Sequence, residues 1–188
     1  MSDVLVPYDL AAERAVLGSA MLSTSVLDDV LSVVEPGDMY EPKHETVFAS
    51  IRRLYEAGAP TDVVAVVDDL LRAGDLQATL DAAYVHELTS NVATAANGAY
   101  YGDIVHQHAI HRRLLEVGAN IAHLAANTGI GALDAVEMAR EKVDRIGANA
   151  SVDVRKFGDY LNFYVEGLEQ KPRYVPTPWW EINNHLGG

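Results

Sequence analysis

The sequence predicts an all-α fold, in which a globular bundle of short helices is followed by a long antiparallel helical hairpin and a separate linker helix. Three observations lead to this prediction. Apolar residues recur at helical spacing along most of the chain, whereas the strict alternation of a half-buried strand is scarce. Glycine, proline and cap residues divide the first half of the chain into short segments. One much longer helical run, between residues 95 and 127, follows them.

The first two helices lie near the N-terminus. Residues 9–22 begin with Asp9, which is suited to capping the first turn of a helix. The positions expected on neighbouring turns of one face are Leu10, Ala11, Arg14, Leu17, Gly18 and Met21. A second, shorter helix is expected over residues 25–34, because Pro36 and the glycine after it end the helical pattern.

Three further short helices complete the predicted bundle. The third spans residues 42–57 and begins with Pro42, a residue suited to the first turn. Thr61 is the expected N-cap of the fourth helix, residues 62–73, and the fifth covers residues 80–88. Because the segments are short, amphipathic and closely connected, they are expected to pack into one compact helical globule.

The long run at residues 95–127 is expected to fold back on a second helix, residues 133–146. Two helices joined by so short a glycine-containing loop are typical of an antiparallel hairpin. A hairpin buries little by itself, so it should pack on the globule or on another copy of the chain. We therefore expect it to be a self-association element, with a linker following at residues 147–152.

A separate helix is expected after this linker, and its apolar residues form a narrow seam on one face. The seam residues are Val154, Phe157, Leu161, Tyr164 and Leu168. Two glycines within the helix each weaken it by about 1 kcal/mol relative to alanine. The helix is therefore predicted to need a groove, either on another body or on its own domain.

Charge limits the classes of partner. The chain has a formal net charge of -13, and residues 1–150 carry 22 acidic and 10 basic side chains, a net charge of -12. Binding to a phosphate backbone draws on Lys and Arg, so a region this acidic favours protein partners over direct DNA binding. The absence of cysteine excludes disulfides. The first ten residues lack the pattern of a signal peptide, and no apolar run is long enough for a membrane span, so we expect an intracellular protein.

The histidines are the first candidates for a metal site. The stretch HQHAIHR contains His106, His108 and His111 within the long helix. Only residues three or four apart share a helix face, so His108 and His111 form a possible pair and His106 points elsewhere. Histidines at the surface or at the hairpin interface are the simpler interpretation.

A di-metal bundle is the competing enzyme hypothesis. Glu41 and His44 have the spacing of one Glu-x-x-His ligand pair, and Asp103 and His106 imitate the second. The sequence contains neither a nucleophile elbow nor a G-x-x-x-x-G-K-[ST] phosphate loop, so no catalytic, cofactor-binding or metal-binding residue is assigned. Two non-enzymatic hypotheses are a DNA-binding domain with a hidden helix-turn-helix and an acidic protein-protein adaptor.

Several stretches, read in order, resemble the N-terminal domain of DnaB-type replicative helicases. VPYDLAAERAVLGSAML looks like its opening helix, EPGDMYEPKHETVFASIRRLYEAGAPTDVVAVVDDL its next block, and YVHELTSNVATAANGAYYGDIV the continuation. The positions that carry the resemblance are Pro7, Asp9, Ala12, Glu13, Val16, Leu17, Gly18, Asp38, Tyr40, His44, Phe48, Ile51, Leu54, Gly58, Pro60, Asp62, Leu88, Ala96, Asn97 and Tyr100. Met39 departs from the more usual Phe.

The end of the sequence extends the resemblance to essentially the whole chain. VPTPWWEINNHLGG is similar to the entrance strand and turn of the RecA-like ATPase domain, with Pro178, Trp179 and Asn183 as departures from the pattern. The expected domains are a helical head at 1–94, a hairpin at 95–147, a linker and linker helix at 148–174, and the start of a truncated ATPase domain at 175–188.

The resemblance implies a function for each part. Head and hairpin would form the oligomerisation and primase-recruiting collar of a hexameric, ATP-dependent helicase that unwinds DNA at the replication fork in the cytoplasm. The implied partners are other copies of the chain, as dimers and a trimer of dimers, a DnaG-type primase, a helicase loader, and single-stranded DNA through the full hexamer. The fragment itself would be no enzyme. ATP and Mg²⁺ would belong to the parent's motor domain, and the seam would dock on the neighbouring subunit.

Overall fold

The computed structural model describes residues 5–76, 80–90, 92 and 94–149, with side chains up to residue 146. The elements formed by this part of the chain are helices, as predicted. They are α1 (Leu10–Leu22), α2 (Thr24–Leu31), η1 (Pro36–Asp38), α3 (Pro42–Glu56), α4 (Val63–Ala73), α5 (Ala82–Ser90), η2 (Ala95–Asn97), α6 (Gly98–Ala126) and α7 (Ala132–Asn149).

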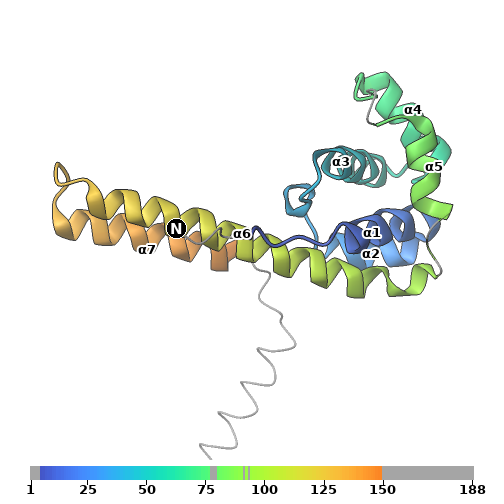
Figure 1. The fold of residues 1–188 in the computed structure, drawn as a ribbon. Coiled ribbons are helices and arrows are strands. Elements are labelled where there is room, and N and C mark those ends of the chain that lie inside the picture. The colour runs from blue at the N-terminus through green and yellow to red at the C-terminus, as the bar shows by residue number, and fades with distance from the viewer. Residues whose placement is uncertain (1–4, 77–79, 91, 93, 150–188) are drawn as a thin grey trace, which may run out of the picture. The chain divides into compact units, whose positions relative to one another are not determined.

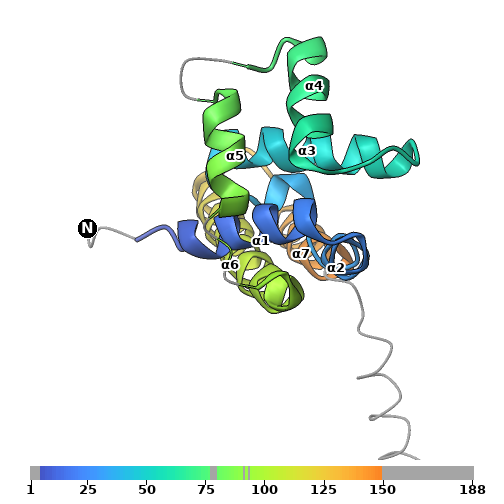
Figure 2. The ribbon, with the colours of Figure 1, turned by 90° about the vertical axis from the view of Figure 1, so that its right-hand side faces the viewer.

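Helix α1 lies at the centre of the head, which consists of α1 to α5 and the first half of α6. It packs against α2, α3, α5 and α6 (Figures 1 and 2). The largest fully buried apolar side chains of the head are Phe48, Leu17, Leu27, Ile51 and Leu70. Removing such side chains from water is the main favourable contribution to folding, and these five come from α1, α2, α3 and α4.

The predicted helix starts are confirmed at α1 and α3 and corrected at α4. The Asp9 carboxylate accepts hydrogen bonds from the backbone N–H groups of Ala11 and Ala12, both at 2.9 Å. At α4 the N-cap is Asp62, not Thr61, because the Asp62 carboxylate accepts from the second and third N–H groups of the helix. Thr61 is buried immediately before it.

Two glycines allow helices of the head to approach closely. A Cβ atom at Gly18 would overlap the carbonyl oxygen of Leu88, where α1 meets α5. A Cβ atom at Gly98 would overlap the side chains of Val26 and Ser19, where α6 begins against α1 and α2. Any side chain at these positions therefore requires the helices to separate.

Helix α6 leads out of the head. It has 29 residues, and its buried residues end at Ala109. Its second half pairs with α7 through a short connection at residues 127–131, which forms the predicted hairpin (Figure 1). Among the described helices, α7 packs substantially against α6 alone. The hairpin therefore does not pack on the globule. Packing on the globule was one of the two arrangements predicted for it, and packing on another copy of the chain was the other.

Some boundaries differ from the prediction. Helix α2 ends at Leu31 rather than residue 34. In the turn that follows, the N–H groups of Val33 and Val34 both donate to the carbonyl oxygen of Val30. Helix α7 continues to Asn149, so residues 147–149 are helical where the sequence predicted the start of a linker. None of the helices in the described ranges is both long and apolar enough to cross a lipid bilayer.

Candidate functional site

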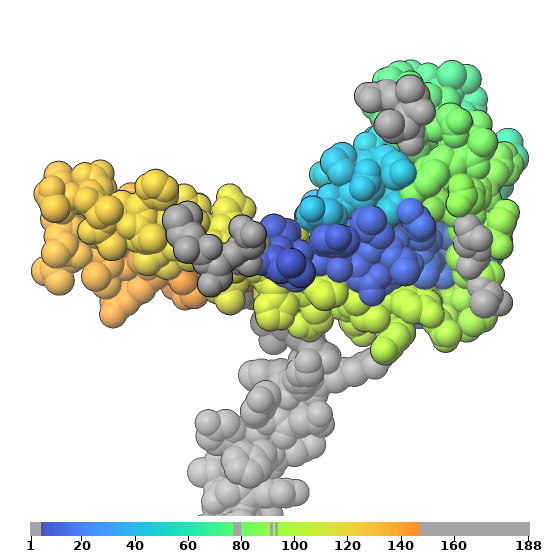
Figure 3. All heavy atoms as spheres, viewed as in Figure 1, coloured from blue at the N-terminus to red at the C-terminus, as the bar shows by residue number. Residues whose placement is uncertain are grey.

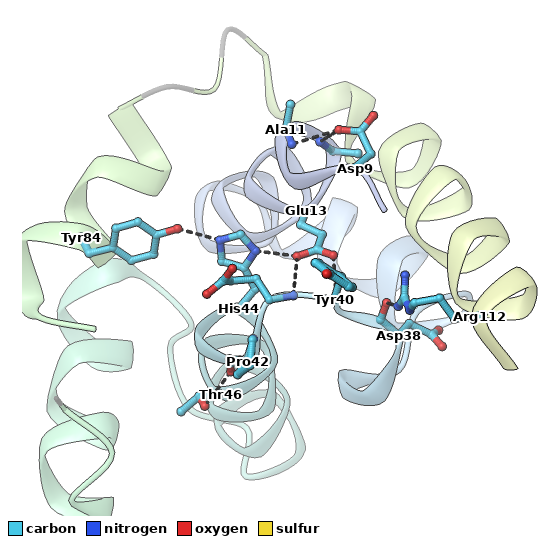
Figure 4. A network of polar contacts seen from close by, with 12 residues as sticks. Asp9, Ala11, Glu13, Asp38, Tyr40, Pro42, His44, Thr46, Tyr84 and Arg112 are labelled. Atoms are coloured by element: carbon cyan, nitrogen blue, oxygen red, sulfur yellow. Dashed lines mark hydrogen bonds and ion pairs between the residues drawn. The ribbon is translucent and has the colours of Figure 1, made fainter. Parts of the chain in front are cut away.

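A buried polar network organises the head around Glu13, on α1 (Figure 4). Its Oε1 atom accepts from the N–H of Tyr40 at 2.6 Å, and its Oε2 atom accepts from the N–H of Glu41 at 3.3 Å. The Nδ1 atom of His44 lies 2.6 Å from Oε2, and its Nε2 atom lies 2.6 Å from the Tyr84 hydroxyl. These contacts connect α1 to α3 and α5.

The same contacts fix the roles of the His44 ring. Two backbone N–H groups already donate to the Glu13 carboxylate, and Nδ1 also acts as a donor to it, because an ionised carboxylate can only accept. In the neutral imidazole, Nε2 then accepts from the Tyr84 hydroxyl. The Lys43 ammonium lies 4.0 Å from the centre of the Tyr84 ring. Each polar atom of the Glu13 and His44 side chains therefore has a partner within the head.

A second polar network is centred on Asp38, whose side chain is 0% exposed. Its Oδ2 atom accepts from the N–H of Glu35 at 3.0 Å and lies 2.9 Å from Nδ1 of His106. Its Oδ1 atom accepts from Arg113, and its carbonyl oxygen accepts from Arg112. Asp38 therefore joins the head to the middle of α6.

The residues considered for a di-metal site are not brought together as ligand pairs. His44 pairs with Glu13 rather than Glu41, and His106 pairs with Asp38 rather than Asp103, which is exposed. Within the described ranges, no group of three or more His, Asp or Glu side chains is arranged to hold a metal ion. The prediction of a surface or interface position is wrong for His106, which is buried and pairs with Asp38.

The hairpin carries the clearest candidate for an interaction site. Helix α7 has no buried residue among its described side chains, and both hairpin helices expose large apolar residues. We call this set the hairpin surface: Leu114, Leu115, Leu133, Val136, Met138 and Val143. Leu133, Val136 and Val143 are separated by steps of three and seven, so they follow one side of α7.

An apolar hollow lies beside this side of α7, near the connection between the two helices. Its lining includes Ile121, Leu124, Ala135, Val136 and Ala139. Four charged residues of α7 form ion pairs within the helix, Glu137 with Arg140 and Glu141 with Arg145. A partner that covers the hairpin surface therefore meets apolar side chains beside charges that already have a counter-ion.

Sequence reasoning identified the hairpin but not the buried polar pairs. Glu13 and His44 are 31 residues apart and Asp38 and His106 are 68 apart, so no local pattern links them. An available signal was the position of Glu13 among apolar residues on consecutive turns of α1. The predicted seam residues Val154, Phe157, Leu161, Tyr164 and Leu168 lie outside the described residues.

Comparisons with known proteins point to one family. The sequence model of the family described as DnaB-like helicase N terminal domain matches residues 5–107. The chain is 41% identical to the replicative DNA helicase DnaB of Leifsonia xyli over 147 residues, 78% of this chain and 32% of that protein. It is 40% identical to the replicative DNA helicase DnaB of Mycobacterium leprae over 139 residues, 73% of this chain and 23% of that protein. The chain therefore spans about a third or less of these two relatives.

A solved structure shares the fold. The crystal structure of the N-terminal domain of DnaB helicase from Mycobacterium tuberculosis is similar with a TM-score of 0.70 and 40% sequence identity. The similarity covers 74% of this chain and 99% of that one, a larger part of this chain than residues 5–107. The fold of the described residues is therefore that of a known helical domain.

Proposed function

The chain belongs to the DnaB-like helicase N-terminal domain family, and on this premise we propose that it joins helicase subunits into a ring-shaped collar through its hairpin. The observation that supports this proposal most directly is the hairpin surface, a set of exposed apolar side chains on a helix pair whose α7 packs substantially only against α6 among the described helices. Fully burying one Leu or Val side chain contributes about 1.5–3 kcal/mol. Several such side chains, each at least 41% exposed, give a second copy apolar area to cover.

Symmetry makes a second copy a suitable partner for this surface. In a two-fold pair the same patch serves both partners, so one apolar face covers another. Closure of three such pairs gives the six copies of a collar. We propose the hexamer because the chain belongs to this family. On the same basis we propose that the parent protein unwinds duplex DNA, with ATP and Mg²⁺ bound in its motor domain.

Recruitment of a DnaG-type primase, with a helicase loader as a further partner, is the second part of the proposal. Its support from this chain is the acidity of residues 1–150, which favours protein partners, and the exposed apolar hairpin. Single-stranded DNA would be bound through the full hexamer, at the replication fork in the cytoplasm. We also propose that the seam at residues 154–168 docks on the motor domain of a neighbouring subunit.

Sedimentation equilibrium of the chain across a wide concentration range tests the collar. The 20.4 kDa protomer should assemble into multiples of two, up to about six copies. Val136→Asp, at a position 48% exposed on the hairpin surface, should weaken this assembly at least about tenfold, because a charge replaces an apolar contact. Circular dichroism establishes that the helices of the variant remain folded.

Val64→Asp is the matched control, since it makes the same change at a valine 71% exposed on α4, in the head. It should leave the assembly unchanged. Equal weakening by the two variants, or a monomer at every concentration of the unaltered chain, would show that the hairpin surface is not the interface between copies. Titration of a purified DnaG-type primase onto the assembled chain tests recruitment separately.

A further inference from the structure

Three residues in the middle of α6, one before and two after Ala109, contact the same short segment of the head. His106 and Arg113 bind the side chain of Asp38, and Arg112 binds its carbonyl oxygen. Ala109, the last buried residue of α6, lies between them in sequence. These polar contacts therefore lie where α6 leaves the apolar core of the head.

We propose that Asp38 is a positioning residue, and that with these three partners it forms a polar joint that sets the direction in which the hairpin extends from the head. Beyond the joint, α6 packs on α7 and the head no longer restrains it through buried residues. The joint is a property of one chain and does not depend on self-association.

The acceptor geometry of Asp38 explains why a carboxylate is required. Both of its oxygens receive donors, Oδ1 from Arg113 and Oδ2 from the N–H of Glu35 and from His106. An asparagine of the same shape would direct an NH₂ group at one of these donors. Asp38→Asn therefore breaks part of the joint without creating a cavity.

A second set of contacts brings the N-terminal segment into the joint. Nη1 of Arg112 donates to the carbonyl oxygen of Pro7 at 3.1 Å, and the Arg112 guanidinium lies 5.7 Å from the centre of the Tyr40 ring. That ring stacks on Tyr8 with 4.4 Å between centroids. Figure 4 shows Arg112 reaching from α6 to Asp38, and Figure 3 shows residues 5–9 lying against α6.

The charges around Arg112 restrain the position of its guanidinium. Burial lowers the pKa of the Arg112 guanidinium, while the nearby carboxylates of Glu13 and Asp38 act in the opposite direction. A partly buried cation with two carboxylates nearby is restrained in place, since leaving them costs electrostatic energy. Arg112 thus connects Asp38 and the N-terminal segment to α6, with the charge of Glu13 nearby.

Small changes at the joint have large effects at the end of the hairpin. From Arg113 to the end of α6 at Ala126 the helix rises roughly 20 Å. A bend of about 10° at the joint would displace the far end by roughly 3 Å. Where copies associate through their hairpins, as the proposed function has it, this direction would also set the diameter of the collar.

The absence of cysteine from the sequence makes the joint directly measurable. Spin labels at Val64→Cys, on α4, and Glu137→Cys, on α7, report the distance between head and hairpin by double electron–electron resonance. Both side chains are exposed, so the labels disturb little packing. Dilution with unlabelled chain removes distances between copies, and the result is therefore independent of the proposed self-association.

The expected result is a narrow distance distribution in the labelled chain that becomes about twofold broader in Asp38→Asn, at a temperature where circular dichroism shows unchanged helix content. Asp69→Asn is the control, because Asp69 also accepts from a serine and an arginine but lies within the head, between α3 and α4. It should leave the distribution unchanged.

An unchanged distribution in folded Asp38→Asn overturns the proposal. If Asp38→Asn loses helix content, the same distance measurement on Arg113→Gln tests the proposal instead. Arg113→Gln removes one donor to Asp38 and leaves Asp38 bound to His106 and Glu35. Broadening in folded Arg113→Gln supports the joint, and an unchanged width rejects it.

Discussion

The carboxylate of Glu13 lies 2.6 Å from Nδ1 of His44, although the two residues are 31 positions apart in the sequence. Both are buried, and the same carboxylate also accepts from the N–H groups of Tyr40 and Glu41. One side chain of α1 therefore satisfies three donors at the start of α3. Removing the acceptor from this network should lower the stability of the head, because each donor left without its acceptor stays buried.

Glu13→Ala should lower the free energy of unfolding by about 3–5 kcal/mol. The substitution removes the acceptor of His44 and of two backbone N–H groups, and water cannot replace it without opening the head. Urea denaturation followed by circular dichroism measures the change. A loss below about 1 kcal/mol would contradict the network as a stabilising feature.

Glu116→Ala is the matched control for this substitution. Glu116 lies exposed on α6, so its removal should change the free energy of unfolding by no more than about 0.5 kcal/mol. A similar loss in both variants would indicate a general effect of removing negative charge rather than the loss of buried hydrogen bonds.

Tyr84→Phe should destabilise the head by about 1 kcal/mol. The change removes only the hydroxyl, which lies 2.6 Å from Nε2 of His44, and leaves that ring nitrogen without its partner. Tyr100→Phe, at an exposed position of α6, makes the same chemical change and should be neutral. Thermal unfolding of the two variants side by side checks the difference, and equal melting temperatures would rule out the Tyr84 contact.

The fold was predictable because its signals are local. Asp9 caps α1 within three residues, and Pro42 begins α3, so caps and helical spacing placed these helices. At α4 two adjacent residues, Thr61 and Asp62, are both suitable caps, and the prediction of Thr61 was wrong. The structure selects Asp62, whose carboxylate reaches the first turn.

The polar pairs were not predictable because they join distant elements. His106 reads as one of three histidines on an exposed helix, and only the fold brings Asp38 to it across 68 positions. The hairpin surface was predictable only in part. Its helices and its need for an apolar partner followed from the pattern, whereas its residues required the structure to show which side chains of α6 and α7 stay exposed.

Gly18→Ala should lower the free energy of unfolding by about 1–3 kcal/mol. Its new methyl group would overlap the carbonyl oxygen of Leu88 and force α1 away from α5. Gly37→Ala is the control with the same change, because no other atom lies within 4 Å of a Cβ at that position. Chemical denaturation should separate the two variants clearly, and equal stability would mean that the close approach of α1 and α5 imposes no constraint.

Acid should weaken the contact between α3 and α4 through Asp69. The hydrogen bond from Ser50, followed by contacts with Arg53, lowers the pKa of the Asp69 carboxyl below its ordinary value of 3.8. A lowered carboxyl pKa stabilises the fold fully above the unfolded value, and this contribution is lost as the pH falls through the lower, folded value. Because the pair is near the surface, the contribution should be about 1 kcal/mol or less.

Ser50→Ala tests this dependence, since it removes the largest cause of the lowered pKa while leaving Arg53 and Arg72 in place. The pKa of Asp69 should rise toward 3.8 in a carbon-13 NMR titration of the side-chain carboxyl. The stability of the variant should also fall less between neutral pH and strong acid than that of the unaltered chain, because less of it depends on an ionised Asp69. Asp68→Asn keeps the Ser50 hydrogen bond and is the control. A pKa of Asp69 that stays in place in Ser50→Ala would assign the shift to Arg53 and Arg72 instead.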